Sequence, residues 1–343
     1  MNRVVLINCY FGKFPNYFDL WIESALKNPD FDFLIFTDNV INKKYDNIKF
    51  INIKFEELKE IFQNVFEFKI CLPNAYKLCD YKAVFGLALQ DYIKDYEFWG
   101  YVDIDLILGN LSNYITKEVL NNSDKINKYG HFQIYRNNMR MNTLFRIDNH
   151  STLYNYKRVF KIKLCCHFDE DHGVSTIAEN ESDIRAQNIN EYFDVDYTKF
   201  AFKNVNGENR NSIFKYENGK LIELFIDENN KISEKEVMYV HLQKRSMEME
   251  ISNTYTSFYI VPNKFIDEIT LDTKKIKEYT MDCEYSEWKL KKRNILINKI
   301  KNNAIQEKVY RILKKIYIKI KYKRNIKMKW GKSCEDRKIF KKC

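Results

Sequence analysis

The chain has few of the residues that form linkers, and it has no long apolar run. Only 9 of its 343 residues are glycine and 4 are proline, which disfavours flexible linkers between domains. No stretch approaches the ~18 consecutive apolar residues that a membrane-spanning helix needs. The apolar run near the amino terminus, residues 4–7, is too short for a signal peptide. We therefore expect a globular protein that stays in the cytosol.

Two further absences restrict the chemistry. The 8 cysteines are scattered, and they form neither a Cys-x-x-Cys pair nor a Cys/His cluster with zinc-finger spacing. A disulfide scaffold and a structural zinc site are therefore disfavoured. The chain also lacks a Walker A loop and a Gly-x-Gly-x-x-Gly motif, which disfavours an ATPase and a nicotinamide-dependent enzyme.

Positive charge is concentrated at the carboxyl end of the chain. Residues 289–343 contain 21 Lys and Arg against 3 Asp and Glu, whereas the other 288 residues contain 36 basic and 44 acidic side chains. The body is therefore mildly acidic and the tail strongly basic. Attraction to an anionic partner is expected of the tail and not of the whole protein.

The first hundred residues alternate between short apolar runs and segments with helical periodicity. This alternation predicts an α/β fold with a mostly parallel, Rossmann-like central sheet. The expected strands are 4–7, 33–36, 48–53 and 98–103, and the expected helices are about 17–27, 55–66 and 81–94. We expect this α/β domain to span residues 1–262, followed by a helical extension at 263–294 and a basic amphipathic tail at 295–343.

Two carboxylates follow the apolar run that begins at Phe98. Asp103 and Asp105 lie two residues apart where a buried strand ends, and open α/β sheets bind ligands at the carboxyl ends of their strands. Two carboxylates there can hold a divalent cation, and the cation can hold a diphosphate. A strand that simply ends in solvated acids is the alternative, since Asp-x-Asp triplets are common by chance.

Other polar residues follow the expected strands and helices on the same side of the sheet. The loop after the first strand and the end of the second are placed to meet a nucleotide, and ordinary loop chemistry is the alternative. A lysine before the expected helix at 81–94 could reach a phosphate, and a neighbouring acid could accept hydrogen bonds from sugar hydroxyls; a solvated helix start is equally consistent. These residues are Asn8, Tyr10, Gly12, Lys13, Asp38, Lys77 and Asp80.

A histidine ends a second apolar run far downstream. His241 follows the run that begins at Val237, and its imidazole would suit a third position beside two carboxylates for a cation such as Mn²⁺. Lys244 and Arg245 come next, at a spacing that suits a diphosphate. An isolated histidine is more often structural, so this interpretation depends on the Asp-x-Asp strand.

A cluster of acids lies between two histidines in an expected loop. Asp169, Glu170 and Asp171 could supply the general base for an acceptor hydroxyl or bind the acceptor. A capped turn would use the same residues.

The tail has the pattern of a helix that lies on an anionic membrane leaflet. One helical stripe is apolar, and lysines and arginines surround it. Nucleic acid is the competing partner, because attraction to phosphate needs only charge; the regular stripe favours a membrane or a partner helix. We expect residues 295–329 to attach the protein to the inner face of the cell membrane. The stripe consists of Ile305, Val309, Ile312, Ile316 and Ile320.

Several of these motifs, in this order, resemble a group of bacterial polysaccharide-biosynthesis proteins. The group looks like GT-A glycosyltransferases of capsule and lipopolysaccharide loci, and the resemblance covers most of residues 4–245 but not the tail. The segments that carry it are Phe11–Phe18, Leu20–Trp21, Phe36–Asp38, Tyr76–Lys82, Phe98–Asp105, Gly109–Asn110, Gly130–Phe132 and Phe168–Glu170.

The resemblance implies roles for individual residues. Asp105 would bind Mn²⁺ or Mg²⁺, and Asp103 would contact ribose, donor sugar or metal. His241 matches a metal-binding histidine of the lipopolysaccharide galactosyltransferase and glycogenin-like group, and Lys244 a lysine that binds diphosphate. The chain departs from that group's His-x-Gly-x-x-Lys-Pro pattern, since His241 is followed by Leu-Gln-Lys-Arg.

These observations predict a metal-dependent glycosyltransferase. It would move a hexose from a nucleotide-diphosphate sugar, a UDP-sugar, to a growing surface-polysaccharide acceptor that is a glycan or a lipid-linked glycan. Three alternatives stay open: a sugar nucleotidyltransferase, a nucleic-acid-binding protein that acts through its tail, and a non-catalytic scaffold of a glycan-assembly complex.

Overall fold

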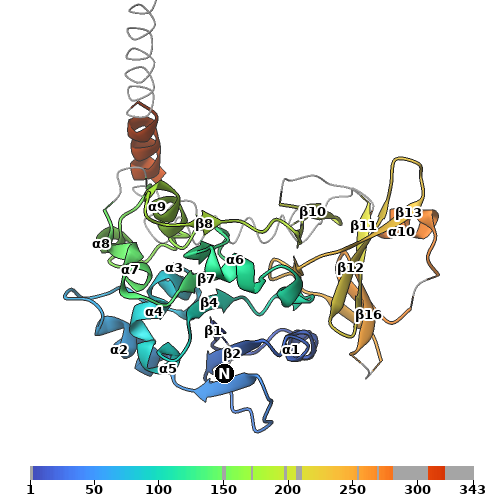
Figure 1. Cartoon of the computed structure of the whole chain (residues 1–343), viewed down its shortest axis with the longest axis horizontal. Coiled ribbons are helices and arrows are strands. Elements are labelled where there is room, and N and C mark those ends of the chain that lie inside the picture. Colours follow the sequence, from blue (N-terminus) through green and yellow to red (C-terminus); the bar gives the residue numbers. More distant parts are fainter. Residues whose placement is uncertain are drawn as a thin grey trace, which may run out of the picture.

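The computed structural model describes residues 3–148, 152–170, 173–196, 199–205, 211–252, 255–268, 270–280 and 308–320. Within these ranges a seven-stranded sheet forms the centre, with the strand order β3-β2-β1-β4-β7-β6-β8. The first four strands of this order pair in parallel, and β7 is antiparallel to β4 and β6. The predicted α/β class with a mostly parallel central sheet is confirmed (Figure 1). The strands are β1 (Val4–Cys9), β2 (Phe31–Thr37), β3 (Ile48–Asn52), β4 (Phe98–Val102), β6 (Lys125–Ile126), β7 (Phe132–Arg136) and β8 (Ala186–Gln187).

The core lies on both faces of this sheet. Side chains alternate along β1, so Val5 and Ile7 join one apolar cluster while Val4 and Leu6 join another. Because both faces are covered, the strand reads as a continuous apolar run. The face with Val4 is covered by helices α1 (Phe18–Leu26) and α6 (Lys117–Asn121). The other face is covered by α2 (Phe55–Gln63), α3 (Leu78–Tyr81), α4 (Phe85–Ala88), α5 (Gln90–Ile93), α7 (Met139–Asn142), α8 (Tyr156–Val159) and α9 (Val174–Asn180).

The prediction of one helix over 81–94 is wrong. This stretch folds as α3, a 3-10 turn at Lys82–Val84, α4 and α5 in succession. Gly86, in α4, lies against the Trp99 ring, and a Cβ at that position would come within 2.3 Å of the ring. Close packing on β4 therefore sets the path of this segment, and the helical periodicity of its own side chains does not.

A small second sheet joins distant parts of the chain. Its order is β10-β9-β14-β5. β14 pairs antiparallel with β5, which places His241 opposite Leu106, and parallel with β9, which places His241 opposite Asp194. The strands are β5 (Leu106–Leu108), β9 (Tyr192–Val195), β10 (Phe202–Asn204) and β14 (Tyr239–His241).

A third sheet has the order β13-β12-β11-β16-β17-β15 and lies to the right in Figure 1. Its last strand in the chain, β17, lies wholly beyond residue 262, where the sequence predicts a domain boundary, and α10 (Thr273–Tyr279) follows. Residues 281–307 and 321–343 of the expected extension and tail lie outside the described ranges. The strands are β11 (Ser212–Glu217), β12 (Lys220–Ile226), β13 (Ile232–Glu236), β15 (Glu248–Glu250), β16 (Ser257–Val261) and β17 (Lys264–Ile266).

The predicted basic helix near the carboxyl end is present at residues 308–320. In Figure 1 it projects from the body beside α8 and α9. None of the helices in the described ranges has the length and apolar character needed to cross a bilayer.

Candidate functional site

The two aspartates of the Asp-x-Asp segment lie at the carboxyl end of β4, and backbone hydrogen bonds fix both of them. The Asp103 N–H donates to the carbonyl of His131 at 2.9 Å. The Asp105 carbonyl accepts from the Leu242 N–H at 2.8 Å, and its carboxylate accepts from the Lys244 N–H at 2.6 Å. The segment after β14 therefore holds Asp105 from two directions.

His241 reaches the same place from β14. Its Nε2 lies 3.4 Å from Asp105 Oδ2, and its Nδ1 lies 2.8 Å from Asp194 Oδ1. Asp103, Asp105 and His241 each offer a ligand atom, and these three atoms lie within 4.8 Å of one another. The structure thus brings together the three residues that the sequence predicts as metal ligands.

Electrostatics couple the buried members of this group. Burial by itself would raise the pKa of Asp105, but His241 and Lys244 outweigh it and lower that pKa. Burial would lower the pKa of His241, but Asp105 and Asp194 overcome it and raise the pKa to about 10. The His241 imidazole therefore lies between two carboxylates that favour its protonated form.

Two carboxylates and one imidazole form a donor set that fits a divalent cation of intermediate hardness. Mn²⁺ accepts both oxygen and imidazole nitrogen, whereas Mg²⁺ is bound mainly by oxygen. Asp105 and His241 are only 5% and 7% exposed, so a cation there would replace the positive charge of the imidazolium. The residues present fit Mn²⁺ better than Mg²⁺.

A second group of possible ligands shares His241, and comprises His131, Asp194 and His241. The His131 ring stacks on His241 with centroids 4.4 Å apart, and its Nε2 lies 2.9 Å from the Tyr239 hydroxyl. Burial, and then His241, lower the pKa of His131 to about 3. Asp194 also accepts from Gln243 Nε2 at 3.1 Å. These contacts make His131 and Asp194 supports of His241 in this structure.

The turn after β14 has an unusual backbone. Gln243 and Lys244 both have φ of 54°, a left-handed conformation that is uncommon for residues other than glycine. This turn directs the Lys244 N–H at Asp105, while the Lys244 ammonium lies 5.0 Å from the centre of the Tyr76 ring. Lys244 thus reaches the rim of the site with both its backbone and its side chain.

Arg245 does not join Lys244 at the rim. It is buried, and its guanidinium donates to the Lys199 carbonyl at 3.1 Å and to Asn263 Oδ1 at 2.9 Å. Its charge holds neighbouring loops together, so of this cationic pair only Lys244 lies at the rim of the site.

Lys82 is a member of the site that sequence reasoning did not assign. Its ammonium donates at 2.5 Å both to Asp103 Oδ1 and to the Gly130 carbonyl. Burial would lower the pKa of Lys82, but Asp103 and then Asp169 raise it above its ordinary value. Lys82 therefore carries a fixed positive charge between the Asp-x-Asp segment and the acidic cluster.

Lys77 and Asp80 are placed differently from the prediction. They form a buried ion pair of 2.6 Å. Lys77 Nζ also donates to two backbone carbonyls in segment 159–164, and Asp80 accepts from two backbone N–H groups in segment 166–168. All three N–H directions of the ammonium are used, so this pair fixes the chain path before the acidic cluster, and we leave both residues out of the proposed donor site.

The predicted nucleotide-side loop lies beside these residues. Asn8 Nδ2 donates to the Val102 carbonyl at 2.6 Å, and Asn8 Oδ1 is buried with no hydrogen-bond partner in the described part of the chain. Burial, and then the charge of Asp105, raise the pKa of the Tyr10 hydroxyl. The Gly12 N–H, at a φ of 94°, donates to Asp38 Oδ1 at 2.9 Å. The structure therefore brings Asn8 and Tyr10 to the Asp-x-Asp strand and joins Gly12 to Asp38, while Lys13 is exposed on the same loop.

The acidic cluster lies on the Lys82 side of the site. A Cβ at Gly130 would meet Glu170 Oε1 at 2.4 Å and Asp169 Oδ2 at 2.7 Å. Asp169 is buried, its Oδ1 has no partner in the described ranges, and burial raises its pKa well above the usual range. Burial would also raise the pKa of Glu170, but His167, whose Nδ1 is 3.4 Å away, lowers it. Asp171 lies outside the described residues.

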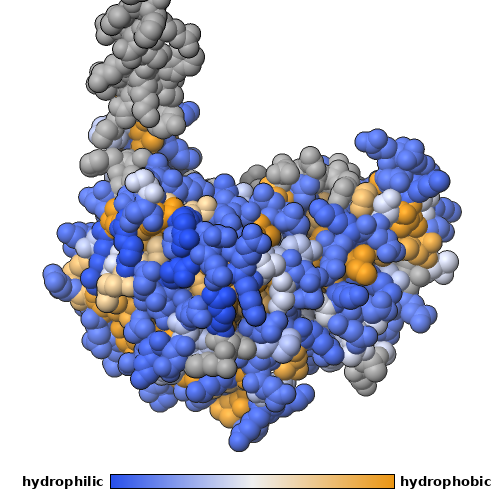
Figure 2. All heavy atoms as spheres, in the orientation of Figure 1, coloured by the Kyte–Doolittle hydropathy of each residue, from blue (hydrophilic) through white to orange (hydrophobic). Residues whose placement is uncertain are grey.

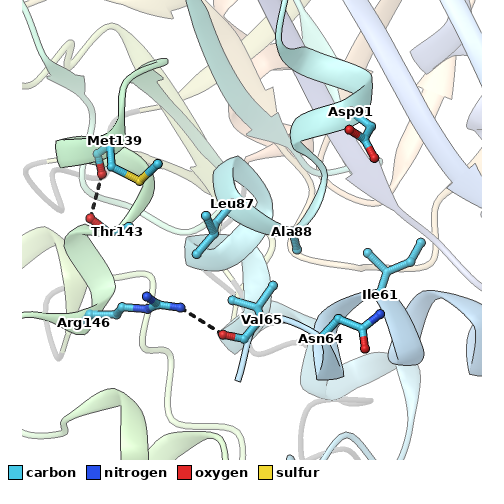
Figure 3. A pocket seen from close by; sticks show the side chains of 9 residues that line it. All are labelled: Ile61, Asn64, Val65, Leu87, Ala88, Asp91, Met139, Thr143 and Arg146. Carbon is cyan, nitrogen blue, oxygen red and sulfur yellow. Dashed lines mark hydrogen bonds between the residues drawn. The ribbon is translucent and has the colours of Figure 1, made fainter. Parts of the chain in front are cut away.

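A surface hollow of about 600 Å³ lies elsewhere, among helices α2, α4, α5 and α7 (Figure 3). Its lining mixes apolar and polar side chains, and includes Arg146, which donates to the Val65 carbonyl at 2.9 Å. None of the predicted site residues lines it, so the candidate site stays at the carboxyl end of β4.

A family model described as a family of unknown function (DUF6625) matches residues 6–269, well over half of the chain. The chain belongs to this family. No curated protein matches it in sequence.

Two similar solved structures are both of the galactosyltransferase LgtC, one in complex with donor and acceptor sugar analogues and one of an active-site mutant. Each is 12% identical and has a TM-score of 0.30; the match covers 56% of this chain and 75% or 74% of LgtC. A likeness of this size does not place the residues of one protein on those of the other.

Sequence reasoning missed Lys82, Asp194 and His131 as members of the candidate site. Lys82 follows the predicted Lys77 by five positions, and only the broken helical path shows which of the two reaches β4. Asp194 lies in a polar stretch without a clear period, and its role depends on the β9–β14 register. His131 lies in Gly130–Phe132, one of the segments that carry the resemblance, and this is the one signal that the sequence offers for it.

Proposed function

We propose that the chain is a metal-dependent glycosyltransferase that moves a hexose from a nucleotide-diphosphate sugar, a UDP-sugar, to a growing surface-polysaccharide acceptor. The observation that supports this most is the convergence of Asp103, Asp105 and His241 at the carboxyl ends of parallel strands. That edge of an open α/β sheet is where ligands bind.

Asp105 and His241, with Asp103, would hold the divalent cation. When bound, the cation supplies positive charge for the diphosphate as it departs. Asp194 orients the imidazole by accepting the hydrogen bond from Nδ1, so that Nε2 faces the carboxylates. The donor set favours Mn²⁺ over Mg²⁺ for this role.

Other residues would bind the rest of the donor. The Lys244 ammonium at the rim supplies a compact charge for the diphosphate. Asn8 Oδ1, which has no hydrogen-bond partner among the described residues, would accept from a donor group of the base or ribose. The loop of Tyr10, Gly12 and Lys13, closed by Asp38, borders the same space. Lys82 keeps Asp103 in place and offers its charge to the transferred sugar or phosphate.

The acidic cluster would serve the acceptor. Glu170 has a lowered pKa and a partly exposed side chain, so it is ionised and accessible to an acceptor hydroxyl. We assign it the base role if the reaction inverts configuration. Burial raises the pKa of Asp169, which favours its protonated form, and in that form it would donate a hydrogen bond. Asp171 keeps its predicted role in this cluster.

A thermal-shift screen of nucleotide sugars, with and without Mn²⁺, tests the proposal. Saturation at about 100 times Kd stabilises a protein by ~2.7 kcal/mol, which raises Tm on the order of several degrees. We expect this rise only when a UDP-sugar and Mn²⁺ are both present, and not in Asp105→Ala. Asp95→Ala, a change at an exposed acid outside the site, is the matched control and should behave as wild type.

Two outcomes would contradict the proposal. Equal stabilisation of Asp105→Ala and wild type would remove Asp105 from the metal site. Release of pyrophosphate in place of a nucleoside diphosphate during turnover would identify a nucleotidyltransferase instead.

A further inference from the structure

The helix at residues 308–320 carries an apolar stripe that is open to solvent. Its large apolar side chains follow each other at intervals of one and three residues, which places them on one face. Each of these side chains is between 49% and 61% exposed, whereas the apolar side chains in the core of the body are buried. Figure 2 shows apolar surface on the described part of this helix next to hydrophilic surface. The stripe comprises Val309, Ile312, Ile316 and Ile320 of the predicted stripe together with Leu313 and Tyr317. Ile305 of the predicted stripe lies outside the described residues.

Positive charge flanks this stripe on both sides. The segment 308–320 contains five basic residues and no acidic one. Apolar residues bordered by lysine and arginine are typical of helices that lie in the interface of an anionic bilayer. Nucleic acid would account for the charge but not for the stripe. The basic residues are Lys308, Arg311, Lys314, Lys315 and Lys319.

The first turns of this helix are attached to the body. The Tyr310 ring stacks on Tyr154 with centroids 5.9 Å apart, and the Arg158 guanidinium lies 3.8 Å from the centre of the Tyr310 ring. Arg311 also donates to the Tyr154 hydroxyl. The rest of the helix projects beyond these contacts (Figure 1), so its direction is fixed by α8 and the residues before it.

The attachment point belongs to the segment that leads into the acidic cluster. Tyr154 and α8 are followed by segment 159–168, which the Lys77–Asp80 pair clamps to α3. Asp169 and Glu170 come next in the chain. One continuous stretch of chain, residues 154–170, therefore carries both the attachment point of the helix and the acids of the site.

We propose that the helix at 308–320 docks the protein on an anionic lipid surface, such as the inner face of the cell membrane. Its apolar stripe would face the acyl boundary and its basic flanks the lipid headgroups. In this position it would hold the Asp169–Glu170 side of the site close to the surface where a lipid-linked acceptor lies. This placement of the acids near the acceptor rests on the proposed function, whereas the docking itself does not.

Sedimentation of the full chain with lipid vesicles tests the docking. We expect binding to vesicles of phosphatidylcholine mixed with phosphatidylglycerol, weaker binding at high salt, and little binding to phosphatidylcholine alone. Ile312→Asn with Ile316→Asn removes part of the stripe but leaves all five charges, and should weaken binding about tenfold or more. Val40→Asn, at an apolar residue of the body that is 75% exposed, is the matched control and should bind as wild type.

A second double variant distinguishes the contribution of the basic residues to binding from that of the apolar stripe. Lys314→Gln with Lys315→Gln keeps the stripe, and each lost charge should weaken vesicle binding roughly fivefold. Circular dichroism and the Mn²⁺-dependent thermal shift with nucleotide sugar should match wild type in all variants, because none of these residues is in the proposed donor site. If the wild type shows no Mn²⁺-dependent thermal shift with nucleotide sugar, that result counts against the proposed function and leaves the docking result intact.

Two results would overturn the docking proposal. One is unchanged binding of the Ile312/Ile316 variant to anionic vesicles. The other is tight binding of a single-stranded oligonucleotide that the lysine variant loses and the isoleucine variant keeps, with no preference for anionic over neutral vesicles; the partner would then be nucleic acid.

Discussion

Asp194 allows the role of His241 to be tested without removing a proposed ligand. Its Oδ1 lies 2.8 Å from His241 Nδ1 and 3.1 Å from Gln243 Nε2, so Asp194→Ala frees the imidazole to rotate away from Asp105. A hydrogen bond to a charged group contributes about 1.5–3 kcal/mol. At ~1.4 kcal/mol per decade this corresponds to a loss of Mn²⁺ affinity of about 10- to 100-fold, the range found for other residues that orient metal ligands.

Isothermal titration of the apo protein with Mn²⁺ measures this directly. Asp194→Asn keeps an oxygen acceptor for Nδ1 and should recover part of the lost affinity, while Asp95→Ala should match wild type. His241→Ala gives the lower limit, since it removes the ligand itself. Wild-type Mn²⁺ affinity in Asp194→Ala would refute the reasoning, because the imidazole would then be held by something else or would not bind the metal.

Two further variants test neighbouring parts of the site. Lys77→Met leaves the buried Asp80 without its partner and should lower the free energy of unfolding by about 3–5 kcal/mol, measured by urea denaturation; unchanged stability with loss of nucleotide-sugar binding would instead restore Lys77 to the donor site. Gly130→Ala places a Cβ at 2.4 Å from Glu170 Oε1 and 2.7 Å from Asp169 Oδ2, so it should displace both acids and lower kcat on the order of 10²-fold while Mn²⁺ affinity stays the same. An unchanged kcat in Gly130→Ala would argue against a role for these acids.

The central sheet could be predicted because its strands are buried on both faces. Residues 4–7, 33–36 and 98–102 read as apolar runs, and each becomes a parallel strand. The segment 81–94 could not be predicted in the same way. Its periodicity is helical, but the path depends on the contact of Gly86 with Trp99, which no local pattern reveals.

The residues of the candidate site differ in the same way: some could be predicted from local sequence and others could not. Asp103, Asp105 and His241 each follow an apolar run, so their place at strand ends is visible in the sequence. Lys82 and Asp194 are visible only once long-range pairing is known, because one is directed by the packing of a broken helix and the other by the β9–β14 register.

The pairing of β14 with β5 also has a consequence for synthesis and folding. Within the described sheets β5 has β14 as its hydrogen-bonded neighbour, and pairing the two strands closes the loop between Leu108 and Tyr239, which is more than a third of the chain. During synthesis Asp105 emerges long before His241, so no nascent chain shorter than about 241 residues can assemble the three ligands. A chain truncated before β14 would leave Leu106–Leu108 as an apolar edge strand, which is prone to pair with other chains. Binding of a metal at these residues would therefore report that β14 has joined β5, and a chain that ends before β14 would be prone to aggregate.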